Sequence, residues 1–94
     1  MYRIKLVFLM LLVFLSVSGC LAKSDEEKKA EYFEKGKTYI EEGDLKSAEL
    51  ELRNAIQVDP EYAEAYLLLG ETLLTLGNAQ DAYQAYGKVE QLDP

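Results

Sequence analysis

The 94-residue chain contains no histidine, no tryptophan and only one cysteine, and these absences narrow its chemistry. Without histidine it lacks the commonest metal ligand and the commonest general base at neutral pH. One cysteine cannot form an intramolecular disulfide, and no histidine is present to activate the Cys20 thiol as a nucleophile. We therefore expect no catalytic site, no metal site, no cofactor and no enzymatic activity.

Basic residues are also scarce. The chain has 10 Lys and Arg but 17 Asp and Glu, which gives a formal net charge of −7. Phosphate binding needs clustered Lys and Arg, so we expect no nucleic-acid partner. The acidic segments "SDEEKK" and "YIEEGD" mix carboxylates with lysines and lack the spacing of a Ca²⁺ loop. We interpret them as solvated helix faces, and we expect no small-molecule substrate.

The first twenty residues combine a positive charge, an apolar run and small residues. Arg3 and Lys5 precede the run Leu6–Leu15, which is followed by "SVSG". Ten apolar residues fall short of the roughly 20 that a membrane-spanning helix needs. A charged start, a short apolar run and small residues before a cleavage point are typical of a secretory signal.

The tetrapeptide "VSGC" at Val17–Cys20 resembles a bacterial lipobox. That resemblance implies that residues 1–19 are a signal peptide cleaved before Cys20, whose thiol and new amino terminus carry covalent lipid. Several acyl chains on one residue anchor more firmly than a single chain. The alternative is an uncleaved membrane anchor with an incidental cysteine.

The same resemblance places the protein in the cell envelope, lipid-anchored and facing the periplasm. In enteric bacteria an Asp after the lipidated cysteine directs retention in the inner membrane, and here Leu21 stands at that position. The resemblance therefore favours the outer membrane. Residues 20–28 are predicted to form the lipidated end and a polar tether, and Ser24 and Glu27 have the spacing of a helix capping box.

The remaining chain repeats itself with a period of 34 residues. Shifting the sequence by 34 pairs residues suited to packing or turns, namely Tyr32 with Tyr66, Gly36 with Gly70, Gly43 with Gly77, Ala48 with Ala82, Leu52 with Tyr86, Ala55 with Val89, and Pro60 with Pro94. Self-similarity at such a period is typical of stacked helical repeats.

This pattern resembles the tetratricopeptide repeat, a helix–turn–helix unit. The resemblance implies an all-α fold of two units, at residues 29–62 and 63–94, forming a fragment of an α-solenoid. The residues at the repeat's structural positions are Tyr32, Gly36, Tyr39, Ala48, Pro60, Tyr66, Gly70, Ala82 and Pro94. By the same comparison Tyr86 is structural, whereas Tyr62 and Tyr83 are the freer tyrosines.

Local signals place the helix ends. We predict helices over residues 25–42, 45–58, 60–76 and 79–92. Gly43 and Gly77 suit a left-handed position after a helix, and Asp44 and Asn78 can cap the helix that follows. Asp59 is predicted to cap the third helix, with Pro60 in its first turn.

Two glycines fall inside predicted helices, where glycine costs about 1 kcal/mol relative to alanine. The presence of Gly36 and Gly70 at these positions is explained if a neighbouring helix approaches closely there. We expect Ala48 and Ala82 to be the small residues that face them.

The resemblance also implies a partner-binding groove, because the first helix of each tetratricopeptide unit lines the concave side of the array. The positions that face the groove hold Phe33, Lys37, Ile40, Glu41, Glu64, Leu67, Glu71 and Leu74. Family members that bind C-terminal carboxylates use Lys, Asn and Arg, and that function is not transferred here because Phe33 and Leu67 occupy such positions. Alternatively, the four apolar residues of this set are simply core.

The preferred function is a non-enzymatic protein-binding scaffold of the envelope. Solenoids need about three units and a polar cap, so we expect further repeats beyond Pro94 or a dimer partner. The segment "ELRNAIQVDPEYAEAYLLLGE" resembles lipoproteins of exosortase and exopolysaccharide systems, and type IV pilus assembly lipoproteins are the second comparison. Two further alternatives are an N-terminal adaptor of a larger enzyme and a cytoplasmic co-chaperone adaptor.

Overall fold

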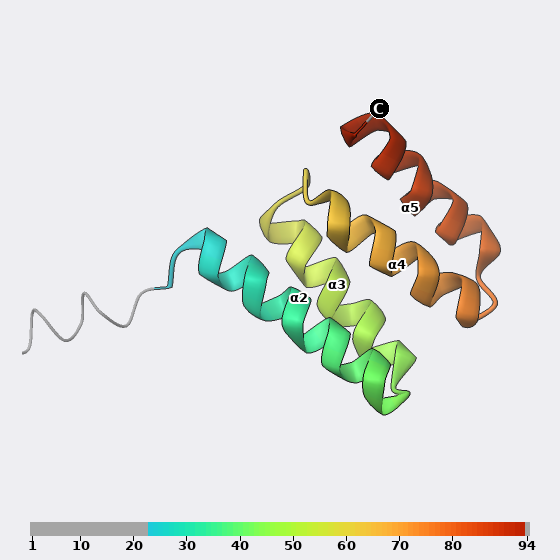
Figure 1. Cartoon of the computed structure of the whole chain (residues 1–94), viewed down its shortest axis with the longest axis horizontal. Coiled ribbons are helices and arrows are strands. Elements are labelled where there is room, and N and C mark those ends of the chain that lie inside the picture. The colour runs from blue at the N-terminus through green and yellow to red at the C-terminus, as the bar shows by residue number, and fades with distance from the viewer. Residues whose placement is uncertain (1–22, 94) are drawn as a thin grey trace, which may run out of the picture.

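The computed structural model describes residues 23–93, which form four helices (Figure 1). These helices are α2 (Asp25–Glu42), α3 (Leu45–Val58), α4 (Ala63–Thr75) and α5 (Ala79–Leu92). The predicted all-α class is confirmed, with no strand in the described part of the chain. Residues 1–19, which are predicted to be a signal peptide, lie outside the described residues, as do Cys20 and Pro94.

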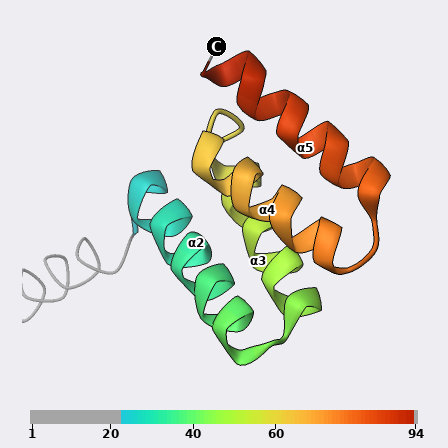
Figure 2. The same cartoon turned by 45° about the vertical axis from the view of Figure 1, so that its right-hand side comes forward.

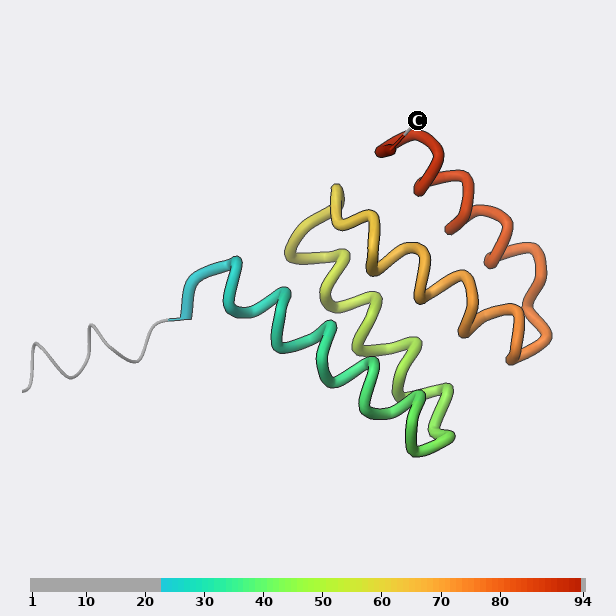
Figure 3. The backbone as a smooth tube through the Cα atoms, in the orientation of Figure 1, coloured from blue at the N-terminus to red at the C-terminus, as the bar shows by residue number. Residues whose placement is uncertain are grey.

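The helices stack in chain order, and each runs opposite to the one before it. Figure 1 shows α2, α3, α4 and α5 side by side, and Figure 2 shows α3 between α2 and α4. The tube in Figure 3 shows the turns alternating between the two ends of the stack. The extensive contacts within residues 23–93 join α2 to α3, α3 to α4 and α4 to α5. This is the stack of two helix–turn–helix units that the 34-residue period predicts.

Each unit turns at a glycine in the left-handed conformation. Gly43 has a φ of 81° and Gly77 a φ of 85°, as expected from their places after a helix. The Gly43 N–H donates to the Ile40 carbonyl (3.0 Å) and the Asp44 N–H to that of Tyr39 (2.9 Å). The second turn repeats this pattern of hydrogen bonds, which satisfies carbonyls that a helix end leaves free.

The predicted caps are confirmed at three helix starts. The side chain of Ser24 accepts from the Glu27 N–H at 3.2 Å. Asp44 and Asn78 each accept from the N–H three residues on, at 3.3 Å. Because α2 begins at Asp25, the last four residues of the predicted tether are helical.

The predicted start of the third helix at residue 60 is wrong, because α4 begins at Ala63. Asp59 accepts twice: its Oδ1 from the Glu61 N–H (3.0 Å) and its carbonyl from the Tyr62 N–H (3.1 Å). These bonds make a turn with Pro60 at its second position, where the fixed φ of proline suits a turn equally well. Pro60 therefore belongs to the connection and not to the first turn of the helix.

The core lies where the two units meet. Leu52 and Leu73 are fully buried, and Leu69 and Ala82 complete the buried cluster. The expected close approach at the helical glycines is present, but the alanines are not its main partners. Gly36 packs beneath the Leu52 side chain, with the Ala48 carbonyl farther away, and Gly70 packs beneath the Tyr86 ring. The large side chains of Leu52 and Tyr86 fill the space above the two glycines, which the small side chain of an alanine would leave partly empty.

Candidate functional site

A hollow of about 330 Å³ lies between α2 and α4, and we call it the α2–α4 groove. Its lining residues are Phe33, Lys37, Glu64, Leu67, Leu68 and Glu71. Five of the eight residues expected at a partner-binding surface therefore lie around one hollow. They come from helices separated by the whole of α3 in sequence. Whether they bind a partner stays a prediction.

The other three expected groove residues lie elsewhere. Ile40 is half-buried and packs against the core cluster, while Glu41 is exposed at the end of α2. Leu74 is 50% exposed but does not line the groove. The alternative that the apolar set is core holds in part, because Phe33 also packs on the core, whereas Leu67 is 44% exposed.

Sequence reasoning missed Leu68, which packs against the core from the wall of the groove. On α4 the lining residues Glu64, Leu67, Leu68 and Glu71 stand at positions i, i+3, i+4 and i+7. That spacing marks one face of a helix and was available from the sequence.

Tyr62 holds Phe33 in place at one end of the groove. Their ring centroids are 5.1 Å apart at an interplanar angle of 44°. The Lys29 ammonium stands 4.9 Å from the Tyr62 ring centroid, and that of Lys37 lies 5.5 Å from the Phe33 centroid. The expectation that Tyr62 is free is therefore wrong, while Tyr83 is 81% exposed, in line with its predicted freedom.

An ion pair joins the start of α2 to the turn before α4. Lys29 Nζ lies 2.7 Å from Asp59 Oδ2 and 3.3 Å from Glu26 Oε2. The hydrogen bond from Lys29, with that from the Glu61 N–H, lowers the pKa of Asp59, and the same pair raises the pKa of Lys29. Burial, aided by the charge of Glu64, raises the pKa of Tyr62. These contacts fix the position of α2 relative to α4.

The rim of the groove is acidic. Lys37 is already paired with Glu34 at 3.3 Å, whereas Glu64 and Glu71 form no ion pair with any residue between 23 and 93. An apolar floor with two unpaired carboxylates suits a segment that offers an apolar side chain flanked by Lys or Arg.

A separate hollow of about 560 Å³ lies on the outer side of α2 and α3. Carboxylates dominate its lining, which comprises Glu31, Glu34, Lys35, Thr38, Tyr39, Glu42 and Glu51. Oε2 of Glu51 is buried there without a hydrogen-bond partner. Within residues 23–93 no three Asp, Glu, His or Cys side chains come together so as to hold a metal ion. No helix of that part is long and apolar enough to cross a membrane.

Comparison with protein families finds two repeat models that match the helical part of the chain. A family model described as a TPR repeat matches residues 36–77, and one described as a tetratricopeptide repeat matches residues 63–94. The matches overlap and together run from Gly36 to Pro94. A search of curated proteins found no match to the chain.

Proposed function

We propose that this chain, whose residues 36–94 carry tetratricopeptide repeats, is a scaffold that holds a protein partner in the α2–α4 groove. Such repeats are typically non-catalytic modules for protein–protein interaction. The observation that carries the proposal is Leu67, which remains 44% exposed inside a hollow built by two helices. Exposed apolar surface with a polar rim is typical of a protein interaction site.

The partner segment that fits best is apolar and basic. Leu67 and Phe33 offer apolar contact, and Glu64 and Glu71 offer charge to Lys or Arg on either side of an apolar anchor. A partner helix laid in the groove would place its anchors at i, i+3 and i+4, as other helix-in-groove complexes do. Charge complementarity of this kind selects the partner and speeds its association.

We further propose that the scaffold is a lipoprotein of the bacterial envelope, anchored through Cys20 and facing the periplasm, with the outer membrane favoured. Support comes from the lipobox resemblance and the short apolar run before it. Four residues separate Cys20 from α2, and they extend at most about 14 Å. The repeats would therefore work next to the membrane surface. The resemblance of residues 51–71 to lipoproteins of exosortase and exopolysaccharide systems supports a role in the assembly or export of such a system.

The groove is tested by site-specific crosslinking in living cells. A photo-crosslinking residue, p-benzoylphenylalanine, replaces Leu67, and the matched control replaces Leu50, a 59% exposed leucine on α3 that lines none of the hollows described above. We expect a discrete protein adduct from position 67 that is lost when Glu64→Lys and Glu71→Lys are added. Equal adducts at both positions, or an adduct indifferent to those charges, would refute the groove.

The anchor is tested separately by membrane fractionation of Cys20→Ser. We expect the wild-type protein in the membrane fraction and the variant in the soluble periplasmic fraction. Unchanged membrane association of the variant would support an uncleaved apolar anchor instead. Neither result of this fractionation changes the crosslinking expected from position 67. The two experiments therefore test the lipid anchor and the α2–α4 groove separately.

A further inference from the structure

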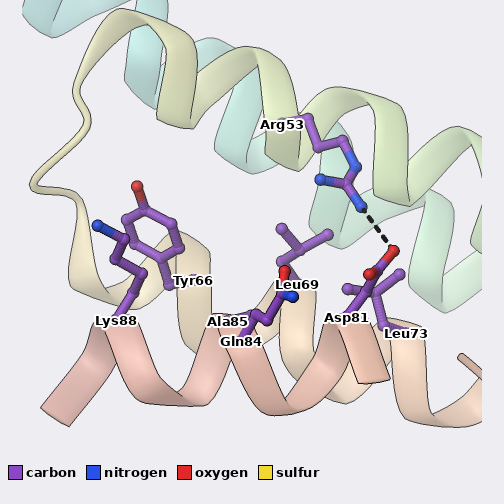
Figure 4. A pocket seen from close by; sticks show the side chains of 8 residues that line it. All are labelled: Arg53, Tyr66, Leu69, Leu73, Asp81, Gln84, Ala85 and Lys88. Carbon is purple, nitrogen blue, oxygen red and sulfur yellow. Dashed lines mark ion pairs between the residues drawn. The ribbon is translucent and has the colours of Figure 1, made fainter. Parts of the chain in front are cut away.

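A second hollow, of about 260 Å³, lies between α3 and α5 over α4, and we call it the α3–α5 pocket (Figure 4). Its lining residues are Arg53 from α3, Tyr66, Leu69 and Leu73 from α4, and Asp81, Gln84, Ala85 and Lys88 from α5. An adjoining hollow of about 290 Å³ shares Arg53, Tyr66 and Leu69 and continues along α3. The surface is thus longer than the pocket alone.

This pocket and the α2–α4 groove use opposite faces of α4. Residues 66, 69 and 73 line the pocket, whereas residues 64, 67, 68 and 71 line the groove. At 3.6 residues per turn, the centres of these two sets lie roughly half a turn apart. A molecule bound in one hollow therefore does not obstruct the other.

The pocket has a fixed apolar base. Leu69, Leu73 and Ala85 are buried beneath it. The Tyr66 hydroxyl donates to the Pro60 carbonyl at 3.0 Å, which holds the ring against the turn. A base already in place lowers the entropy cost of binding.

Charge distinguishes the two ends of the pocket. Figure 4 shows Tyr66 and Lys88 at one end and the Arg53–Asp81 ion pair, with a separation of 4.0 Å, at the other. Arg53 also pairs with Glu49 at 3.0 Å, so its charge is largely neutralised. Lys88 forms no ion pair with any residue from 23 to 93.

The sequence shows how unusual a cation is at this place. Residues 53–94 contain only two basic side chains, Arg53 and Lys88, and both line the α3–α5 pocket. The unpaired cation next to an apolar base suits a carboxylate placed beside an apolar side chain. This preference is opposite to that of the α2–α4 groove.

We propose that the α3–α5 pocket is a second docking site, which takes an apolar side chain from an acidic peptide segment of a partner protein and pairs its neighbouring carboxylate with Lys88. The volume of 260 Å³ lies below the about 300–1,000 Å³ of small-molecule sites, which favours one inserted side chain over a whole ligand. The scaffold then holds an acidic and a basic segment on opposite sides of α4.

The test uses the full chain in detergent micelles and two fluorescein-labelled peptides, one with Leu-Phe flanked by glutamates and one with Leu-Phe flanked by lysines. We expect the acidic peptide to bind by fluorescence anisotropy and Lys88→Glu to weaken it at least tenfold. The matched control Lys28→Glu makes the same charge change on α2, away from both hollows, and should alter Kd less than twofold. Equal losses of affinity in Lys88→Glu and Lys28→Glu would show that only the net charge of the protein matters, and this would overturn the site.

A second variant separates the two hollows. Gln84→Trp places a large ring at the exposed rim of the pocket, and Tyr83→Trp places the same ring one residue away, outside it. We expect only Gln84→Trp to abolish binding of the acidic peptide, with helicity unchanged by circular dichroism and the basic peptide unaffected. Undiminished binding of the acidic peptide to Gln84→Trp, or no binding by the wild-type chain at about 1 mM, would overturn the pocket and leave the groove untouched.

Discussion

A Cβ atom on Gly70 would lie 2.8 Å from Cε1 of Tyr86, closer than side-chain atoms pack in proteins. The same holds 34 residues earlier, where a Cβ on Gly36 would lie 2.9 Å from Cγ and Cδ2 of Leu52. Each glycine is thus the site over which a large side chain of the next helix lies. The helical cost of glycine is offset by this packing inside each unit.

Gly70→Ala is therefore expected to destabilise the protein despite the better helix propensity of alanine. Overpacking costs about 1–3 kcal/mol, against a gain of about 1 kcal/mol from propensity. Gly87 provides the control, because it lies inside α5 with nothing within 4 Å of its Cβ position. Gly87→Ala should stabilise by about 0.5–1 kcal/mol. Urea unfolding measures both, and a gain of stability in Gly70→Ala would contradict the packing argument.

Gly77→Ala is expected to destabilise for a different reason. No atom lies within 4 Å of its Cβ position, so the cost comes from the φ of 85° alone. The left-handed conformation costs an alanine about 1–2 kcal/mol, whereas asparagine tolerates it better. The midpoint of urea unfolding should fall for Gly77→Ala and recover in part for Gly77→Asn. Equal midpoints for the two variants would argue against backbone strain.

The Lys29–Asp59 pair predicts how stability depends on pH. Because the folded state lowers the pKa of Asp59 below its usual 3.8, this contribution is present above that pH and is lost as pH falls through the lowered value. Because the pKa of Lys29 is raised above 10.5, its contribution is present below that pH and is lost as pH rises through the raised value.

The pair is tested by the difference in stability between the wild type and Lys29→Met. That difference should be flat between about pH 5 and 9 and shrink at both extremes. The neighbouring Lys28→Met, which removes an exposed lysine that forms no ion pair among residues 23–93, should leave the wild-type profile in place. A difference that does not vary with pH would show that the charge of Lys29 is not what matters.

Phe33 and Leu67 occupy equivalent positions in the two units but should respond differently to truncation. Phe33 is half-buried and packs on Tyr62, so Phe33→Ala should cost about 2 kcal/mol, below the about 3–5 of a fully buried ring. Leu67→Ala, at an exposed site, should stay within about 0.5 kcal/mol. Thermal unfolding compares them. A large loss in Leu67→Ala would show that the residue is core and remove it from the groove.

Local sequence signals predicted the helix ends well, because a turn or a cap is decided by a few adjacent residues. The hydrogen bonds of the turns and caps span at most five residues, as at Gly43, Asp44, Gly77 and Asn78. The start of α4 was missed because Asp59 and Pro60 are equally compatible with a helix cap and with a turn. The bond from the Tyr62 N–H to the Asp59 carbonyl closes a turn and decides for it, whereas the bond from the Glu61 N–H to Asp59 Oδ1 fits either alternative.

Contacts between distant residues were harder to predict. Tyr62 was expected to be free because it stands at no structural position of the repeat, yet its ring, just before α4, packs on Phe33 of α2. The partners of Gly36 and Gly70 were within reach, since the 34-residue shift already aligned Leu52 with Tyr86. The α3–α5 pocket had no sequence signal, because it needs side chains from three helices in register.

The neighbour-to-neighbour stacking of α2, α3, α4 and α5 also bears on how the protein folds. Each helix finds its main partner next to it in the chain, so few long loops must close before native contacts form. Low contact order of this kind goes with folding in microseconds to milliseconds. Such a chain would expose its apolar faces only briefly while it folds, which lowers the chance of aggregation.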